Sequence, residues 1–149
     1  MQHCQHCGTV FDAPKGKRRS RPQECRLHAL ARAAFDQWPE QAQFRPKSAE
    51  NLRYHLTVAA GFFEVVRQTM LPPDLDNADE LAAIITAFLR SSADDNMFVD
   101  IDGRLLTARR AKSTATMEHR EYNALSTVID ELLMEVGLHP DKLLRERAA

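Results

Sequence analysis

Two short motifs of cysteine and histidine constrain the N-terminal part of this 149-residue chain more than any other feature. Cys4 and Cys7 stand three positions apart, and Cys25 and His28 repeat that spacing further along the chain. Three thiolates and one imidazole complete a tetrahedral zinc site, which is structural because four protein ligands leave no open position for catalysis. The spacing therefore predicts structural Zn²⁺ bound by Cys4, Cys7, Cys25 and His28.

The fourth ligand of this predicted site stays open. His3 and His6 flank the first motif and are alternatives to His28, which also falls in a predicted helix where it can simply pack. An odd number of cysteines, two of them in Cys-x-x-Cys spacing, favours metal or thiols in a reducing compartment over disulfides. The polar N-terminus has no apolar stretch typical of a signal peptide, and no apolar run reaches membrane length. We therefore expect a cytoplasmic protein that does not bind membranes.

Apolar residues recur at helical spacing through much of the remaining chain. Ser48 is a suitable N-cap for a long second helix that continues through Gly61 to Val66, where the internal glycine costs roughly 1 kcal/mol. Asn77 is the expected cap of the third helix, and Gly137 is expected directly after the last one. The predicted helices cover residues 22–37, 48–66, 78–90 and 117–136, and a short charged tail follows over residues 141–147.

A β-hairpin is predicted between the third and the last helix. Two apolar strands flank Asp102-Gly103, a dipeptide that suits a tight turn. Two strands alone are marginally stable, so the hairpin has to pack on helices. The expected fold class is therefore mainly α with minor α+β character, with about four helices, one β-hairpin and an N-terminal zinc-binding knuckle. The expected domains are a zinc-binding segment over residues 1–28 and, continuous with it, a helical domain over residues 22–149 with the hairpin near 97–109.

Basic side chains gather in two short segments, although the formal net charge of the whole chain is only −1. Residues 1–35 alone hold seven basic side chains against two acidic ones. Lys and Arg groups neutralise phosphates, so these segments predict salt-dependent contacts with a nucleic-acid backbone. The alternative is a solvated surface, which we favour for the second segment. The predicted nucleic-acid-binding residues are Lys15, Lys17, Arg18, Arg19 and Arg21 in the first segment, and Arg109, Arg110 and Lys112 in the second.

An acidic stretch balances this positive charge. Residues 71–102 hold eight acidic side chains against one basic side chain. Such a surface can mimic nucleic acid and occlude the site of a partner protein. The alternative is that these acids serve helix starts and turns, where carboxylates stabilise the local backbone. The residues of the partner-binding hypothesis are Asp74, Asp76, Asp79, Asp94 and Asp95.

No catalytic motif stands out, so we expect a protein that is not an enzyme. Asp100 and Asp102 alternate onto one face of a predicted strand, as carboxylates that bind Mg²⁺ in a nuclease do. However, Asp102 is already explained by the turn, and neither a lysine nor a histidine completes the pattern. A metal-dependent nuclease is therefore the less favoured alternative.

Three blocks of the chain resemble a family of small tailed-phage and prophage proteins that is defined only as a domain of unknown function. The blocks span residues 21–39 (RPQECRLHALARAAFDQWP), 52–63 (LRYHLTVAAGFF) and 111–129, in the order that the family has them. Similarity covers most of residues 20–136. The chain departs from the family at Glu24-Cys25, where the family usually has His-Arg, and around residues 72–96, which resemble an insertion. The N-terminal Cys-x-x-Cys is not part of the family.

The resemblance implies a genomic context more than a mechanism. Such proteins tend to be encoded among phage early genes for replication and recombination, which implies a DNA-metabolism accessory role in a bacterial host cell. The first hypothesis is therefore a zinc-stabilised phage protein that binds nucleic acid, most simply DNA, together with a replication or recombination protein. The alternative is an inhibitor of a host factor, of the anti-defence or anti-CRISPR type, that uses the acidic surface. A homodimer is compatible with either hypothesis.

Overall fold

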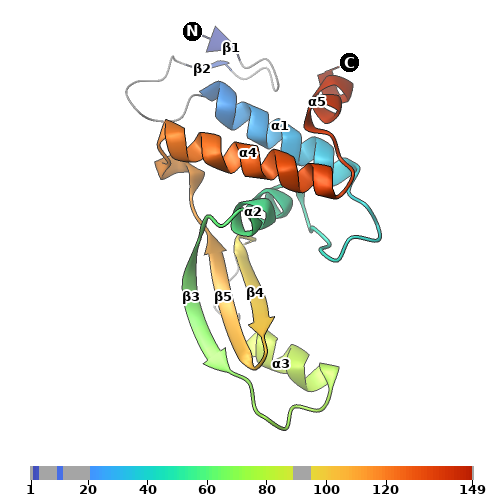
Figure 1. The fold of residues 1–149 in the computed structure, drawn as a ribbon, viewed down its shortest axis with the longest axis vertical. Helices are drawn as coiled ribbons and strands as arrows, with labels where there is room; N and C mark the ends of the chain where they lie inside the picture. The colour runs from blue at the N-terminus through green and yellow to red at the C-terminus, as the bar shows by residue number, and fades with distance from the viewer. Residues whose placement is uncertain (1, 4–9, 12–20, 89–94, 149) are drawn as a thin grey trace.

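The computed structural model describes residues 2–3, 10–11, 21–88 and 95–148. Its elements form a layer of helices from which a small sheet projects (Figure 1). The helices of this part of the chain are α1 (Arg21–Asp36), α2 (Ala49–Ala59), α3 (Ala78–Phe88), α4 (His119–Glu135) and α5 (Pro140–Ala148), with a 3₁₀ turn at Thr114–Thr116. The strands are β1 (Gln2–His3), β2 (Val10–Phe11), β3 (Phe63–Met70), β4 (Met97–Asp102) and β5 (Leu105–Ala111).

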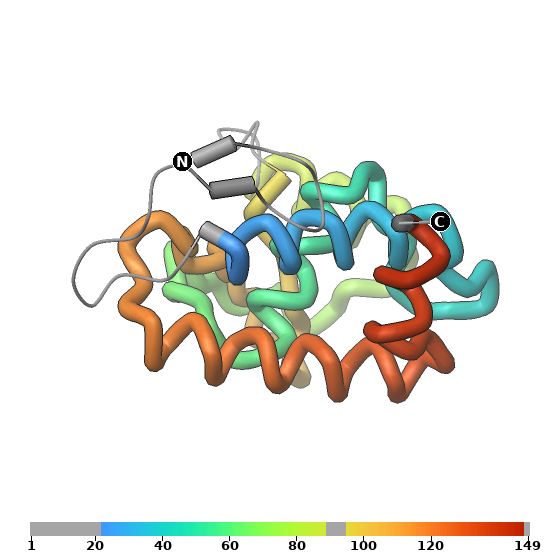
Figure 2. The backbone as a smooth tube through the Cα atoms, turned by 90° about the horizontal axis from the view of Figure 1, so that it is seen from above, coloured from blue at the N-terminus to red at the C-terminus, as the bar shows by residue number. Residues whose placement is uncertain are grey.

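The helical layer holds the larger of two hydrophobic cores. Helices α1 and α4 lie side by side, and α5 crosses their end (Figure 2). The side chain of Arg26 on α1 bonds both carboxylate oxygens of Asp130 on α4, at 3.3 and 3.2 Å. Helix α2 packs beneath α1 and contributes its apolar stripe to the same core. The fully buried side chains at its centre are Leu30, Leu52, Tyr122, Leu125, Ile129 and Leu133.

The sheet has three antiparallel strands in the order β3-β5-β4. Strand alternation places Leu106 and Ala108 of the central strand on one face, and α3 covers that face at the end far from the helical layer (Figure 1). Arg67 on β3 fastens the end of α3, because its guanidinium donates to the Phe88 carbonyl at 3.2 Å and lies over the Phe88 ring. The opposite face of the sheet leaves Val65 and Met70 exposed.

Several local signals read from the sequence are confirmed. The Ser48 hydroxyl accepts from the Asn51 amide at 3.0 Å at the start of α2, and the Asn77 side chain accepts from the Glu80 amide at 2.7 Å at the start of α3. The hairpin forms as strands β4 and β5, and Gly103 in its turn has a positive φ. These signals depend on only a few neighbouring residues, so the rest of the fold does not override them.

The predicted long second helix is wrong. Helix α2 ends at Ala59, and Gly61 adopts a φ of +94°, which only glycine reaches without strain. The chain then enters strand β3, whose β-branched Val65 and Val66 suit a strand better than a helix. Gly61 therefore terminates α2, where the sequence had been interpreted as a glycine inside a helix.

The predicted fold class is also wrong. The described residues form five helices and a three-stranded sheet, where about four helices and one hairpin were expected. The charged tail is helix α5, and Leu143 buries itself in the helical core. The described residues contain no group of three or more His, Cys, Asp or Glu side chains that could hold a metal ion. The predicted zinc-binding knuckle is therefore not part of the fold that these residues form.

Candidate functional site

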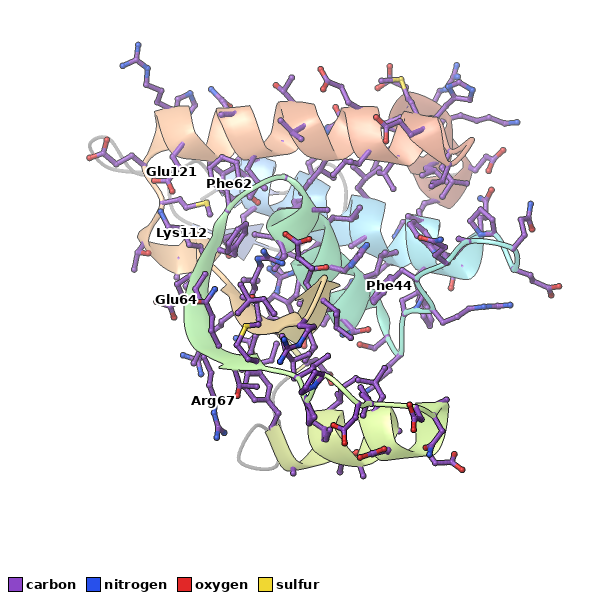
Figure 3. All side chains as sticks on the ribbon, turned by 60° about the horizontal axis from the view of Figure 1, so that its bottom comes forward. Phe44, Phe62, Glu64, Arg67, Lys112 and Glu121 are labelled. Carbon is purple, nitrogen blue, oxygen red and sulfur yellow. The ribbon has the colours of Figure 1, made fainter. Side chains whose placement is uncertain are left out.

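Two hollows lie on opposite sides of the junction between α2 and the sheet. Arg109 and Arg110 are consecutive residues of β5, so their side chains leave opposite faces of the sheet. Arg109 lines a hollow between α2 and the face that α3 does not cover, whereas Arg110 lines a hollow beneath the start of α1. In Figure 3, Lys112 and Glu64, which line the hollow of Arg110, lie near β3, and Phe44, which lines the hollow of Arg109, lies well apart from them.

The hollow around Arg110, named here the polar hollow, has a volume of about 530 Å³. It is built by segments that are far apart in the sequence, because α1, α2, β3, β5 and the 3₁₀ turn all contribute to its wall. The backbone holds two of these segments together, since the Lys112 amide donates to the Phe62 carbonyl at 3.0 Å. Its polar lining includes Glu24, His28, Arg53, Tyr54, Glu64, Asn96, Arg110, Lys112, Ser113 and Thr114.

Arg53 is the buried cation of the polar hollow. The residue is only 6% exposed, and its guanidinium lies over the Tyr54 ring at 4.5 Å. One terminal nitrogen approaches the Glu50 carboxylate at 3.7 Å, but the buried Nε has no hydrogen-bond partner among the described residues. In the same part of the chain, the buried Oδ1 of Asn96 in this wall also has none. Both residues line the hollow, so the guanidinium of Arg53 and the side chain of Asn96 give this wall its polar character.

Two further cations at the polar hollow sit in weak ion pairs. Arg110 approaches Glu64 at 3.3 Å, and Lys112 approaches Glu121 at 3.4 Å. All four side chains are more than a third exposed, and ion pairs in such positions contribute little to stability. Both cations can therefore exchange their carboxylate partners for another anion at small cost.

His28 gives the polar hollow a neutral ring at its inner wall. Burial lowers the pKa of His28, and the nearby Arg53 lowers it further. The imidazole therefore stays uncharged at neutral pH and can act as a hydrogen-bond donor or acceptor.

The second hollow, named here the aromatic hollow, has a volume of about 540 Å³. The rings of Phe44 and His55 stack at a centroid distance of 3.6 Å, and Phe98 stands edge-on to both. The indole of Trp38 donates to the Phe44 carbonyl at 2.8 Å, which fixes the loop that carries Phe44. Burial lowers the pKa of His55, so this ring is neutral at neutral pH. The hollow is lined by Phe44, His55, Val58, Ala59, Phe63, Phe98, Val99, Asp100 and Arg109.

Arg109 supplies the positive charge of the aromatic hollow. Its guanidinium lies 5.0 Å from the centre of the Phe63 ring and bonds the Asp100 carboxylate at 2.7 Å. The Nε of Arg109 is buried and has no hydrogen-bond partner within the part of the chain that the structure describes. Asp100, which the nuclease alternative uses as a metal ligand, is thus engaged by a cation instead.

The residues predicted to bind zinc and nucleic acid are only partly within the described chain. Cys4 and Cys7 lie outside the described residues, as do the four basic positions 15 and 17–19. Cys25 and His28 both belong to α1. Because the other two proposed ligands lie outside the described residues, zinc binding by Cys4, Cys7, Cys25 and His28 stays a prediction. Of the second basic segment, Arg110 and Lys112 meet at the polar hollow, whereas Arg109 lies in the other hollow.

The acidic residues do not form one surface. Asp74, Asp76 and Asp79 are exposed around the start of α3, at the end of the sheet far from the helical layer (Figure 1). Asp95 lies at the other end, because its carbonyl accepts from the side chain of Asn51 on α2 at 2.8 Å. Asp94 lies outside the described residues. The partner-binding hypothesis therefore retains only the group at α3 as a continuous patch.

Sequence reasoning identified Arg109, Arg110 and Lys112 as candidates but missed other residues that shape the two hollows. Arg53 and His55 are the two sequence neighbours of Tyr54 in α2. From the sequence alone, both are typical of the polar face of a helix. Phe44 lies in a loop without regular structure and gave no signal at all. The change in composition after Gly61 was a signal for strand β3. A strand at this position places Phe63 and Glu64 on opposite faces of the sheet.

Comparisons with protein-family models, with curated proteins and with solved structures gave no match. Within the described residues, no helix has the length and apolar character needed to span a membrane.

Proposed function

We propose that this protein binds nucleic acid and that the polar hollow receives phosphate groups of the ligand. The observation that carries the proposal is the convergence of three cations on one hollow, where the buried guanidinium of Arg53 lies in the wall together with Arg110 and Lys112. A phosphate offers acceptor oxygens to all three cations, and guanidinium groups are suited to phosphate geometry. A neutral polar ligand would leave the positive charge of the rim unused.

The position of the first basic segment in the sequence also supports nucleic-acid binding near the polar hollow. Glu24 and His28, in the first turns of α1, line the polar hollow. Arg18 and Arg19 precede the first residue of α1 by three and two positions, and each residue spans at most about 3.6 Å. The first basic segment therefore directly precedes, in the sequence, the helix whose first turns line the polar hollow.

The biological setting is proposed from the resemblance to tailed-phage and prophage proteins. It makes the protein an accessory factor in phage DNA replication or recombination, acting in the cytoplasm of a bacterial host. DNA is the ligand that this setting favours. The resemblance alone supports the setting, whereas the phosphate site is argued from the hollow itself.

The test is binding of the purified chain to labelled single-stranded and duplex DNA at low and moderate salt. We expect binding that weakens steeply as salt rises, because bound cations release counterions from the phosphates. The double variant Arg110→Ala/Lys112→Ala should bind roughly tenfold more weakly, and its salt dependence should fall by about two phosphate contacts.

The control is Arg145→Ala on α5, which removes one positive charge where the double variant removes two. Helix α5 packs against the end of α1 that lies away from the polar hollow, as Asp36 and Glu146 line one recess there. The control variant should bind as the native chain does. Absence of binding at low salt, or equal losses in the control and the double variant, contradicts the proposal and directs the search to a protein partner.

A further inference from the structure

The aromatic hollow has features of a binding site that the phosphate proposal does not use. Its volume of about 540 Å³ lies in the range typical of sites for small molecules. Its walls combine the rings of Phe44, His55, Phe63 and Phe98 with a single charged pair, Arg109 and Asp100. Ring faces attract flat aromatic groups, and the charged pair supplies both a donor and an acceptor at the edge of the hollow.

We infer that the aromatic hollow binds one unpaired base of a nucleic acid, so that the ligand is single-stranded where it contacts this face. A base has a flat π surface for the rings and carries acceptors and donors along its edge. The partly exposed guanidinium of Arg109 lines the hollow and can donate to an acceptor on the base, and the exposed carboxylate of Asp100 can accept from an amino group. This inference rests on the proposed nucleic-acid-binding function.

Two other occupants fit the hollow less well. A phenylalanine side chain of a partner protein stacks on the same rings but offers no acceptor to the Arg109 guanidinium. An aliphatic group fills the volume but gains nothing from the ring faces or from the Arg109–Asp100 pair. Bases within a duplex have both faces stacked and their pairing edges occupied, so only an unpaired base can enter.

The position of the hollow agrees with a ligand that also reaches the phosphate site. Arg109 and Arg110 are adjacent in β5, and Phe63 and Glu64 are adjacent in β3, with one member of each pair at each hollow. The two hollows therefore lie back to back, separated by the thickness of the sheet at its junction with α2. A duplex is too stiff to contact both faces here, whereas a single strand bends within a few nucleotides.

The experiment compares a single-stranded oligonucleotide with an abasic strand of the same length, which keeps the phosphates and lacks the bases. The native chain should bind the normal strand roughly tenfold more tightly than the abasic strand, since stacking of one base contributes on this scale. Phe98→Leu keeps the apolar volume and removes a ring, so it should bind both strands equally. Arg109→Lys, which keeps the charge and lacks the planar guanidinium, is the second variant.

The control variant is Met70→Ala, an exposed residue of the sheet face that carries Arg109 but not a residue of the hollow. It should retain the preference for the normal strand. If the native chain binds both strands equally, the inference is overturned while the proposed function stands.

If neither oligonucleotide binds at low salt, the proposed function fails and a second readout decides about the hollow. Titration with adenosine should then shift the NMR resonances of His55 and Phe98 in the native chain. Unchanged resonances overturn the base site as well.

Discussion

At the scale of single residues, Glu64 offers a change that should strengthen binding. Its carboxylate lies in the polar hollow, 3.3 Å from Arg110, and competes there with any incoming phosphate. Glu64→Gln removes the negative charge while the side chain keeps its size. We expect DNA to bind several-fold more tightly, because Arg110 is released and one repulsion disappears.

Equilibrium binding of DNA to Glu64→Gln and to the native chain at the same salt concentration measures this effect. Glu135→Gln, on the last turn of α4 and outside the polar hollow, is the matched control for a general change in net charge. Equal gains in both variants would mean that long-range charge, and not the hollow, governs binding. Weaker binding by Glu64→Gln would contradict a phosphate at Arg110.

His55 makes folding stability depend on pH. Burial lowers the pKa of His55 below 6.5, so the unfolded chain takes up a proton more readily than the folded chain. The free energy of unfolding therefore decreases as pH falls below about 6.5 and levels off above it. Asp100 and Arg109 face the same hollow, and their opposite charges pair with each other.

Thermal unfolding between about pH 5 and about pH 7.5 checks this dependence on His55. His55→Phe keeps the stacked ring and cannot titrate, so its melting temperature should fall less on acidification than that of the native chain. The exposed His139 provides the control His139→Gln, which should follow the native curve. Identical pH dependence of His55→Phe and the native chain would refute the assignment.

At the scale of elements, Gly61 decides where α2 ends and β3 begins. Its φ of +94° is accessible to glycine, and no atom lies within 4 Å of the place where a Cβ would stand. Gly61→Ala should therefore destabilise the fold through backbone strain alone, by roughly 1 kcal/mol. Gly61→Asn should lose less, because asparagine tolerates positive φ better.

Chemical denaturation of the three proteins gives the order of stability. The expected order is glycine, then asparagine, then alanine. An alanine variant as stable as the native chain would mean that the backbone continues as a helix at this position, as the apolar spacing through Val66 had suggested.

The sequence predicted elements well where a local signal fixes them. Asn77, Ser48 and the Asp102-Gly103 turn act through hydrogen bonds or backbone angles of near neighbours. Strand β3 was missed because Leu52, Leu56, Ala59, Phe63 and Val66 continue at helical spacing across Gly61. The local signals at Gly61, Val65 and Val66 are weaker than this apolar spacing, and the pairing of β3 with β5 joins residues that are far apart in the sequence. The hollows were missed for the same reason, because each needs side chains from several elements.

At the scale of the whole molecule, the two cores differ in size. Among the described residues, thirteen buried ones form the core of the helical layer, whereas four form the core between α3 and the sheet. Local opening is easiest where few apolar contacts are lost. We therefore expect α3 to open more often than α1 and α4.

Hydrogen exchange followed by mass spectrometry measures this difference. Peptides of α3 should exchange well before the core peptides of α1 and α4, around Leu30 and Leu125. Leu106→Ala in the smaller core should speed exchange in α3 and leave the core peptides of the helical layer nearly unchanged. Simultaneous exchange of all these peptides would show that both cores open as one unit.

The location of both hollows at the junction of these two cores leads to the last prediction. A strand that occupies the hollows contacts α2 from the helical layer and β3 and β5 from the sheet, so it binds both units at once. Binding stabilises the folded state by about 2.7 kcal/mol when the ligand exceeds its Kd a hundredfold. Added oligonucleotide should therefore slow exchange most strongly in residues 53–64 and 109–116. Helix α3 lies outside both hollows and should gain little. Protection centred on α3 would instead place the ligand-binding surface at the acidic end of the sheet. It would contradict ligand binding by the two hollows at the junction.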